Sequence, residues 1–97
     1  MIDIFDNTFD KDPDAVLDYQ WDWELWLQPT EVITNATITV PDGIVLDSSS
    51  HDDTTVTAWL SGGTAGIGYM INCHIETLDG AEVREDDRSI YIVCRER

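Results

Sequence analysis

Alternating hydrophobic and polar positions dominate the chain from residue 15 onward. In the segment 15–27, AVLDYQWDWELWL, aromatic and aliphatic side chains occupy every second position from Tyr19 to Leu27. A period of two with aromatic residues predicts a half-buried strand, which we expect to bend near Glu24. A helix at the end of this segment is an alternative that the aromatic content disfavours.

The same period of two continues through most of the remaining sequence. It predicts strands at 31–40, 54–60, 67–77 and 88–94, with a short apolar strand at 44–46. Turn signals separate them: Pro41-Asp42-Gly43, the polar run 47–53, the glycine-rich stretch 61–66, an Asp79-Gly80 hairpin turn and the charged stretch 82–87. About six strands at this spacing indicate an all-β sandwich or barrel.

The alternation also predicts which side chains face the core. Those expected inward are Tyr19, Trp21, Trp23, Leu25, Leu27, Val32, Ala36, Ile38, Val40, Val56, Ala58, Leu60, Tyr69, Ile71, Cys73, Ile75, Ile90, Ile92 and Cys94. Ile33, Trp59 and Met70 fall on the opposite faces of their strands. Trp26 breaks the first alternation and falls opposite Trp21 and Trp23, so it is a candidate for an interface.

Residues 1–14 differ from the rest of the chain. Their apolar side chains, Ile2, Ile4, Phe5 and Phe9, are separated by Asp and Asn. This is too little apolar surface to fold alone, so we expect a mobile arm that becomes ordered on a neighbouring protein. The predicted organisation is an arm at 1–14 and a β domain at 15–97, with Ile2, Ile4, Phe5, Phe9 and Trp26 as candidate partner-binding residues.

Charge narrows the choice of partners. The chain has 20 acidic residues against 5 Lys and Arg, and a net charge of −15. This charge argues against binding to nucleic-acid phosphates or to anionic membranes, and it is compatible with a basic protein partner. No segment is typical of a signal peptide or of a membrane-spanning helix, so we expect synthesis in the cytoplasm.

Catalytic and metal-binding patterns are weak. His51 lies beside Ser48, Ser49 and Ser50, but immediate neighbours in one loop seldom converge as a triad. The stretch 10–14, DKDPD, starts like a calcium-binding loop but lacks the glycine and the glutamate that such a loop needs. We therefore expect no enzyme activity, no cofactor and no metal site.

Cys73 and Cys94 are expected to begin as thiols, and burial as small apolar side chains is the simplest interpretation. A disulfide formed late in assembly stays open as an alternative, because it depends on the strand register.

Three blocks of the sequence resemble a known family. They are DYQWDW with Trp26-Leu27, ATITVPDGI (36–44) and TAWLSGGTAG (57–66), joined by the final hairpin with Asp79-Gly80 and Arg88-Ser89-Ile90. Together they resemble the small immunoglobulin-like proteins of tailed phages that are described as fibre–tail adaptors. The resemblance covers about residues 15–95, and the acidic start and the two cysteines depart from it.

The resemblance implies an immunoglobulin-like antiparallel β-sandwich of about 6–8 strands. It also implies a virion protein, made in the host bacterium and present in several copies, that links the neck or tail to fibres by contacts with other phage structural proteins. A capsid decoration protein is an alternative of the same fold class. A DNA-mimic inhibitor, permitted by the charge, is the alternative from a different class.

Overall fold

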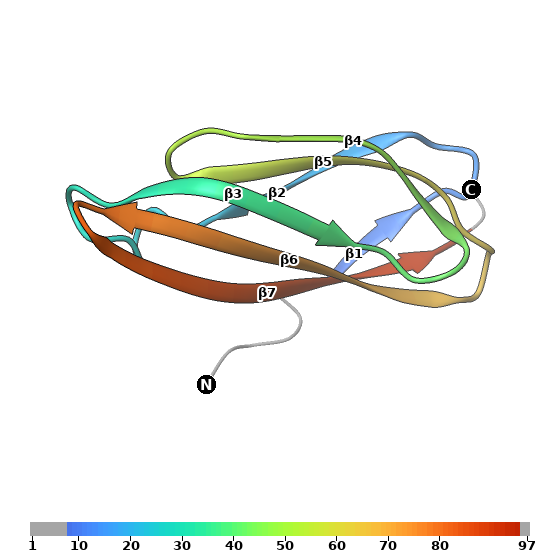
Figure 1. Ribbon diagram of the computed structural model, residues 1–97. Helices are drawn as coiled ribbons and strands as arrows, with labels where there is room; N and C mark the ends of the chain where they lie inside the picture. Colours follow the sequence, from blue (N-terminus) through green and yellow to red (C-terminus); the bar gives the residue numbers. More distant parts are fainter. Residues whose placement is uncertain (1–7, 96–97) are drawn as a thin grey trace.

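Two β-sheets lie face to face in the computed structural model, which describes residues 8–95 and contains no helix in that range (Figure 1). Since there is no helix, residues 8–95 also hold no helical segment long and apolar enough to cross a membrane. The strands are β1 (Thr8–Lys11), β2 (Leu17–Asp22), β3 (Val32–Thr39), β4 (Ile44–His51), β5 (Thr55–Gly62), β6 (Gly68–Asp79) and β7 (Glu82–Cys94).

Strand order confirms the predicted sandwich. One sheet has the order β1-β7-β6-β3 and the other β2-β5-β4. Every pairing is antiparallel except that of β1 with β7. The sets β2-β5-β4 and β3-β6-β7 correspond to strands B-E-D and C-F-G of the immunoglobulin fold. The first strand joins β7 rather than β2, so the larger sheet has four strands.

The core lies between the sheets and follows the alternation of β5, β6 and β7. The exposed fraction is zero for Val56, Ala58, Leu60, Ile71, Cys73, Ile75, Ile92 and Cys94. Tyr19 and Trp21 of β2 complete this layer and are also buried. Removing an aliphatic side chain of this kind from water stabilises the fold by about 1.5–3 kcal/mol.

The glycine-rich connection between β5 and β6 is fixed by hydrogen bonds. The Tyr69 hydroxyl accepts one from the backbone N–H of Thr64 at 2.9 Å, which is the tyrosine corner of immunoglobulin-like sandwiches. Gly63 has φ of +100°, and a Cβ there would overlap the sulfur of Cys94. The run Gly62-Gly63 therefore meets both a backbone and a packing requirement.

One inward-facing prediction for β3 is wrong. Ile33 is buried, whereas Val32 is only half-buried. The register shifts between Ile33 and Asn35, so a β-bulge reverses the alternation at that point. Before the bulge an odd-numbered residue, Ile33, faces the core. After it the even-numbered Ala36 and Ile38 face the core, as predicted.

Two predicted loops are parts of strands. The polar run that starts at Asp47 continues β4 as far as His51, and the charged stretch that starts at Glu82 belongs to β7. In β4 the polar side chains are exposed because this strand forms the edge of its sheet and pairs only with β5. Backbone pairing with β5, rather than apolar alternation, makes this segment a strand.

The N-terminal segment also differs from the prediction. Residues 8–11 form β1, which runs parallel to β7 with Thr8 opposite Tyr91 and Lys11 opposite Cys94. The Lys11 side chain is fully buried, and its ammonium donates hydrogen bonds to the carbonyl oxygens of Asp12 and Gly62 at 2.8 and 2.7 Å. These polar contacts hold residues 8–11 against β7, although the low apolar content of the segment had predicted a mobile arm. Residues 1–7 lie outside the described residues.

The cysteines are buried free thiols. The register places Cys73 opposite Arg88, six positions along β7 from Cys94. Six residues of strand span about 20 Å, whereas a disulfide needs Cα atoms within about 7 Å. The register therefore excludes a disulfide within the chain. Burial raises the pKa of the Cys73 thiol to about 12, with a smaller contribution from Asp87, so this thiol is unreactive at neutral pH.

Candidate interaction surfaces

The residues considered for catalysis do not converge. His51 is exposed at the end of β4, and its Nδ1 lies 3.1 Å from the carbonyl oxygen of the adjacent Asp52. The Asp52 carboxylate accepts hydrogen bonds from the backbone N–H groups of Thr54 and Thr55, which lowers its pKa. It orders the β4–β5 turn and does not orient the histidine.

The side chains of Asp10, Lys11 and Asp12 in the acidic stretch 10–14 already interact with other groups of the chain. The Asp10 carboxylate pairs with Arg95 at 3.0 Å, the Asp12 carboxylate accepts from the N–H of Asp14 at 2.9 Å, and Lys11 points inward. In the described part of the chain no three His, Cys, Asp or Glu side chains are grouped closely enough to hold a metal ion.

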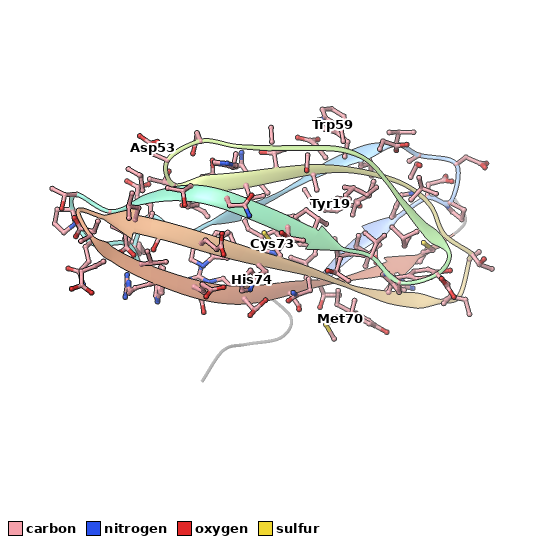
Figure 2. The ribbon with its side chains drawn as sticks, viewed as in Figure 1. Tyr19, Asp53, Trp59, Met70, Cys73 and His74 are labelled. Atoms are coloured by element: carbon pink, nitrogen blue, oxygen red, sulfur yellow. The ribbon has the colours of Figure 1, made fainter. Side chains whose placement is uncertain are left out.

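The outer face of β2-β5-β4 carries the most exposed tryptophan. Trp59 is 44% exposed and projects from the central strand β5 (Figure 2). Its neighbours in register are Asp18 of β2 and Ser48 of β4. The exposed Val45 of β4 pairs with Ser61, which lies two positions after Trp59 in β5. We call these residues the Trp59 surface: Trp59, Val45, Asp18 and Ser48. Exposed aromatic side chains are enriched at protein interfaces, and Trp is among the residue types that contribute most to binding there.

The outer face of the four-stranded sheet has a second apolar site. Met70 is 58% exposed and projects from the side opposite to Trp59 (Figure 2). It pairs in register with Tyr91, which is 40% exposed and lies over Gly68, where a Cβ would overlap the tyrosine hydroxyl. We call Met70, Tyr91 and the adjacent Val93 the Met70 patch. Thioether and aromatic groups are both enriched at protein interfaces.

A polar network continues along this outer face from the Met70 patch. The His74 ring lies between Glu85 and Asp87, with nitrogen–oxygen distances of 2.7 and 3.0 Å. The Asp87 carboxylate also accepts a hydrogen bond from Asn72 at 3.0 Å. Hydrogen bonds to Glu85, then to Asp87, raise the pKa of His74. This network ties β6 to β7 and keeps the middle of the face polar.

The predicted interface residue Trp26 is half-buried. It lies after the end of β2 at Asp22, in the connection to β3. The Arg84 guanidinium lies over its ring at 3.8 Å from the centroid, and Arg88 covers Trp23 at 5.0 Å. Leu25, predicted to face inward, is fully exposed in the turn. The alternation fails there because the strand has ended.

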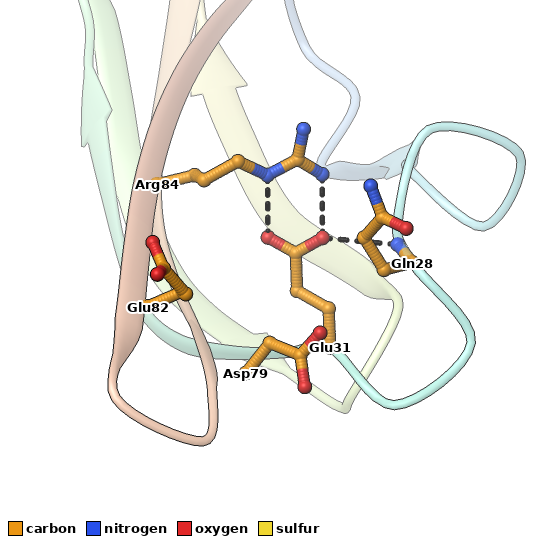
Figure 3. Close-up of a pocket in the computed structure, with 5 residues that line it drawn as sticks. All are labelled: Gln28, Glu31, Asp79, Glu82 and Arg84. Atoms are coloured by element: carbon orange, nitrogen blue, oxygen red, sulfur yellow. Dashed lines mark hydrogen bonds and ion pairs between the residues drawn. The ribbon is translucent and has the colours of Figure 1, made fainter.

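Arg84 is held by the buried carboxylate of Glu31 (Figure 3). Two guanidinium nitrogens bind the two carboxylate oxygens, the Nε of Arg84 at 2.8 Å from Oε2. Gln28 N–H and the Thr77 hydroxyl also donate to this carboxylate. The hydrogen bonds from Arg84, followed by those from Gln28 and Thr77, lower the pKa of Glu31 to about 2. This site fixes the connection 23–31 against β7.

Of the other predicted partner-binding residues, Phe9 is described and 38% exposed, with its ring 5.3 Å from that of Tyr19 in an edge-to-face arrangement. Ile2, Ile4 and Phe5 lie outside the described residues. The candidate list lacked Trp59, Met70 and Tyr91. The alternation contained the signal for all three, because it placed them opposite the core side chains of their strands.

The chain matches a known protein family. Residues 11–93 match the family model described as podophage GP4 fiber-tail adaptor protein gp77. No curated protein matches the chain. The matched range runs from the end of β1 almost to the end of β7, so it covers nearly the whole sandwich and both candidate surfaces.

Proposed function

The chain belongs to the family of podophage fibre–tail adaptor proteins, and we propose that it acts as a rigid connector with one partner on each face of the sandwich. As a member of this family it is a phage virion component. We further propose that several copies are present in each particle, so that repeated weak contacts add up to firm attachment.

The observation that carries this proposal is the opposition of the two surfaces. The Trp59 surface lies on the three-stranded sheet, and the Met70 patch lies on the outside of the four-stranded sheet. A connector must contact two partners at once without steric conflict, and opposite faces of one sandwich meet this requirement. The buried core between them keeps the two surfaces at a fixed separation.

The expected partners are phage structural proteins of the neck, tail or fibres. The charge of −15 favours basic protein surfaces and disfavours nucleic acid and anionic lipid. We propose synthesis in the cytoplasm of the host bacterium and no catalytic activity. The family match favours the adaptor over a capsid decoration protein or a DNA-mimic inhibitor.

Ile2, Ile4 and Phe5 stay in the proposal as residues that bind a neighbouring protein, together with the exposed Phe9. Trp26 is a weaker candidate, since Arg84 already covers one face of its ring.

Substitution of Trp59 and Met70 tests the two-surface arrangement. We expect Trp59→Ser and Met70→Ser each to leave the melting temperature unchanged and to lower fibre attachment roughly tenfold, because each removes an exposed anchor. Val83→Ser is the matched control, since Val83 is 62% exposed and lies outside both surfaces. Normal fibre content in particles carrying both substitutions would contradict the proposal.

A further inference from the structure

The edges of the two sheets differ in how well they are protected against pairing with another strand. The edge strands are β1 and β3 in one sheet and β2 and β4 in the other, and β7 is unpaired on one side beyond the end of β1. Natural sandwiches protect such edges with charges, bulges or very short strands.

Four of these edges carry such protection. Strand β1 has only four residues, including Asp10 and Lys11, and β2 has Asp18 and Asp22. Strand β4 has Asp47 and a register shift between Leu46 and Ser48. The unpaired part of β7 is highly charged, with the sequence EVREDDRSI. Pairing with an additional strand is disfavoured at each of them.

Strand β3 lacks this protection over most of its length. Its sequence, VITNATIT, contains no charged residue. Its bulge lies near the start, where the N–H of Ile33 donates to the carbonyl oxygen of Asp53 at 2.9 Å. From Asn35 to Thr39 the register with β6 is unbroken, and β6 is the only neighbouring strand of β3 within residues 8–95.

The core is also incompletely closed beside this edge. Ala36, Ile38 and Val40 from the β3 side and Leu46 from β4 pack against the core but are only half-buried. We call these four residues the β3–β4 seam. On the opposite side of the sandwich, Lys11, Tyr19 and Trp21 are buried. An added strand on β3 would bring apolar side chains over the seam.

We propose that the β3 edge from Asn35 to Thr39 is a β-augmentation site that accepts an extended strand of another virion protein. The inference rests on the proposed function, since it supplies a means of attachment for one partner. Backbone hydrogen bonds along the edge would provide affinity, and apolar side chains against the seam would provide specificity.

Charge identifies the kind of strand that fits. Glu76 lies beside Asn35 in register, and the exposed Asp42 follows β3 in the next turn. The occupant is therefore a strand with apolar side chains on one face and neutral or basic side chains on the other. A second copy of this chain is disfavoured, because two molecules with a net charge of −15 repel one another.

Hydrogen exchange in the free protein and in intact particles tests the proposal. We expect the outward-facing amides of Asn35–Thr39 to exchange at least about tenfold more slowly in the particle, because a partner strand would bond them. If the chain is present but these amides exchange at the free rate, the inference is wrong and the adaptor function stands. If the chain is absent from particles, both fail.

A charge variant adds a second readout. Thr37→Lys with Thr39→Lys places two ammonium groups on the edge, and we expect incorporation into particles to fall roughly tenfold. Ala81→Lys with Val83→Lys is the control, with the same charge change in the exposed β6–β7 hairpin. Equal incorporation of the two double variants, with equal melting temperatures, would overturn the proposal.

Discussion

Two parts of the sandwich reach stability by different means. The segments packed on β7, which are β1 and the connection 23–31, are held by charged side chains: Lys11 on two carbonyl oxygens and Arg84 on Glu31. The β3–β4 seam has no charged residue and stays half-exposed. Its uncharged side chains pack against the core but stay half-exposed to solvent.

The difference indicates that one part stabilises the fold and the other is available for binding. Buried charges demand defined partners, because an unpaired buried charge is costly, so they fix the segments that hold them. Half-exposed uncharged side chains impose no such demand and are available to a partner. Substitutions should therefore affect stability in the first part and assembly in the second.

The largest effect on stability is expected from Lys11→Ala. The change removes a fully buried side chain and its hydrogen bonds to the carbonyl oxygens of Asp12 and Gly62, of which that of Asp12 still accepts one from the N–H of Ala15. We expect the free energy of unfolding in urea to fall by about 3 kcal/mol. Lys11→Met, which restores most of the volume, should lose less. A loss below about 1 kcal/mol for Lys11→Ala would show that β1 is not held in this way.

Glu31→Gln is expected to cost about 2 kcal/mol, because it breaks a buried pair whose partner Arg84 stays partly hydrated. The effect should depend on pH. The folded-state pKa of Glu31, about 2, lies below its usual 4.5, so the stabilisation is present above about pH 4.5 and is lost as the pH falls toward 2. Urea unfolding of both proteins from pH 7 to pH 2 should show the difference shrinking with acid. A difference independent of pH would contradict this account of the site.

Ile38→Thr tests the seam. The substitution keeps a β-branched side chain in a strand, and Ile38 is already half-exposed, so we expect a loss below about 1 kcal/mol. Ile71→Thr, at a fully buried position, is the matched control and should cost about 2–3 kcal/mol. Similar losses at the two positions, measured by urea unfolding, would remove the distinction between seam and core.

His74→Gln should have the smallest effect. Glu85 and Asp87 raise the pKa of His74 in the folded protein. The protonated ring therefore stabilises the fold fully below the usual pKa of about 6.5, and this contribution is lost as the pH rises through the folded-state value. We expect the variant to melt slightly below the natural chain at pH 5.5 and at the same temperature at pH 9. A difference that grows with pH would refute the assignment.

The sequence predicted the sandwich and most of its inward-facing residues, because the two-residue period survives in β5, β6 and β7. It failed where another interaction overrides that period. The bulge after Ile33 reverses the phase, and the end of β2 at Asp22 leaves Leu25 exposed. Strand β1 was missed because a buried lysine holds it, and the composition of a segment does not show where its carbonyl partners lie.

Prediction of the interaction surfaces was less complete. The alternation already placed Trp59 and Met70 outward, whereas Trp26 was predicted at an interface because it falls opposite Trp21 and Trp23. Arg84, distant from Trp26 in the sequence, covers that ring. The unprotected β3 edge depends on strand order, which no local pattern reveals.

Cryo-electron microscopy of the virion that carries this chain tests the central claim most directly. The account predicts density for the sandwich between the tail or neck and the fibres, with different proteins contacting the Trp59 surface and the Met70 patch. Density on the capsid lattice, or absence of the chain from the particle, would contradict it.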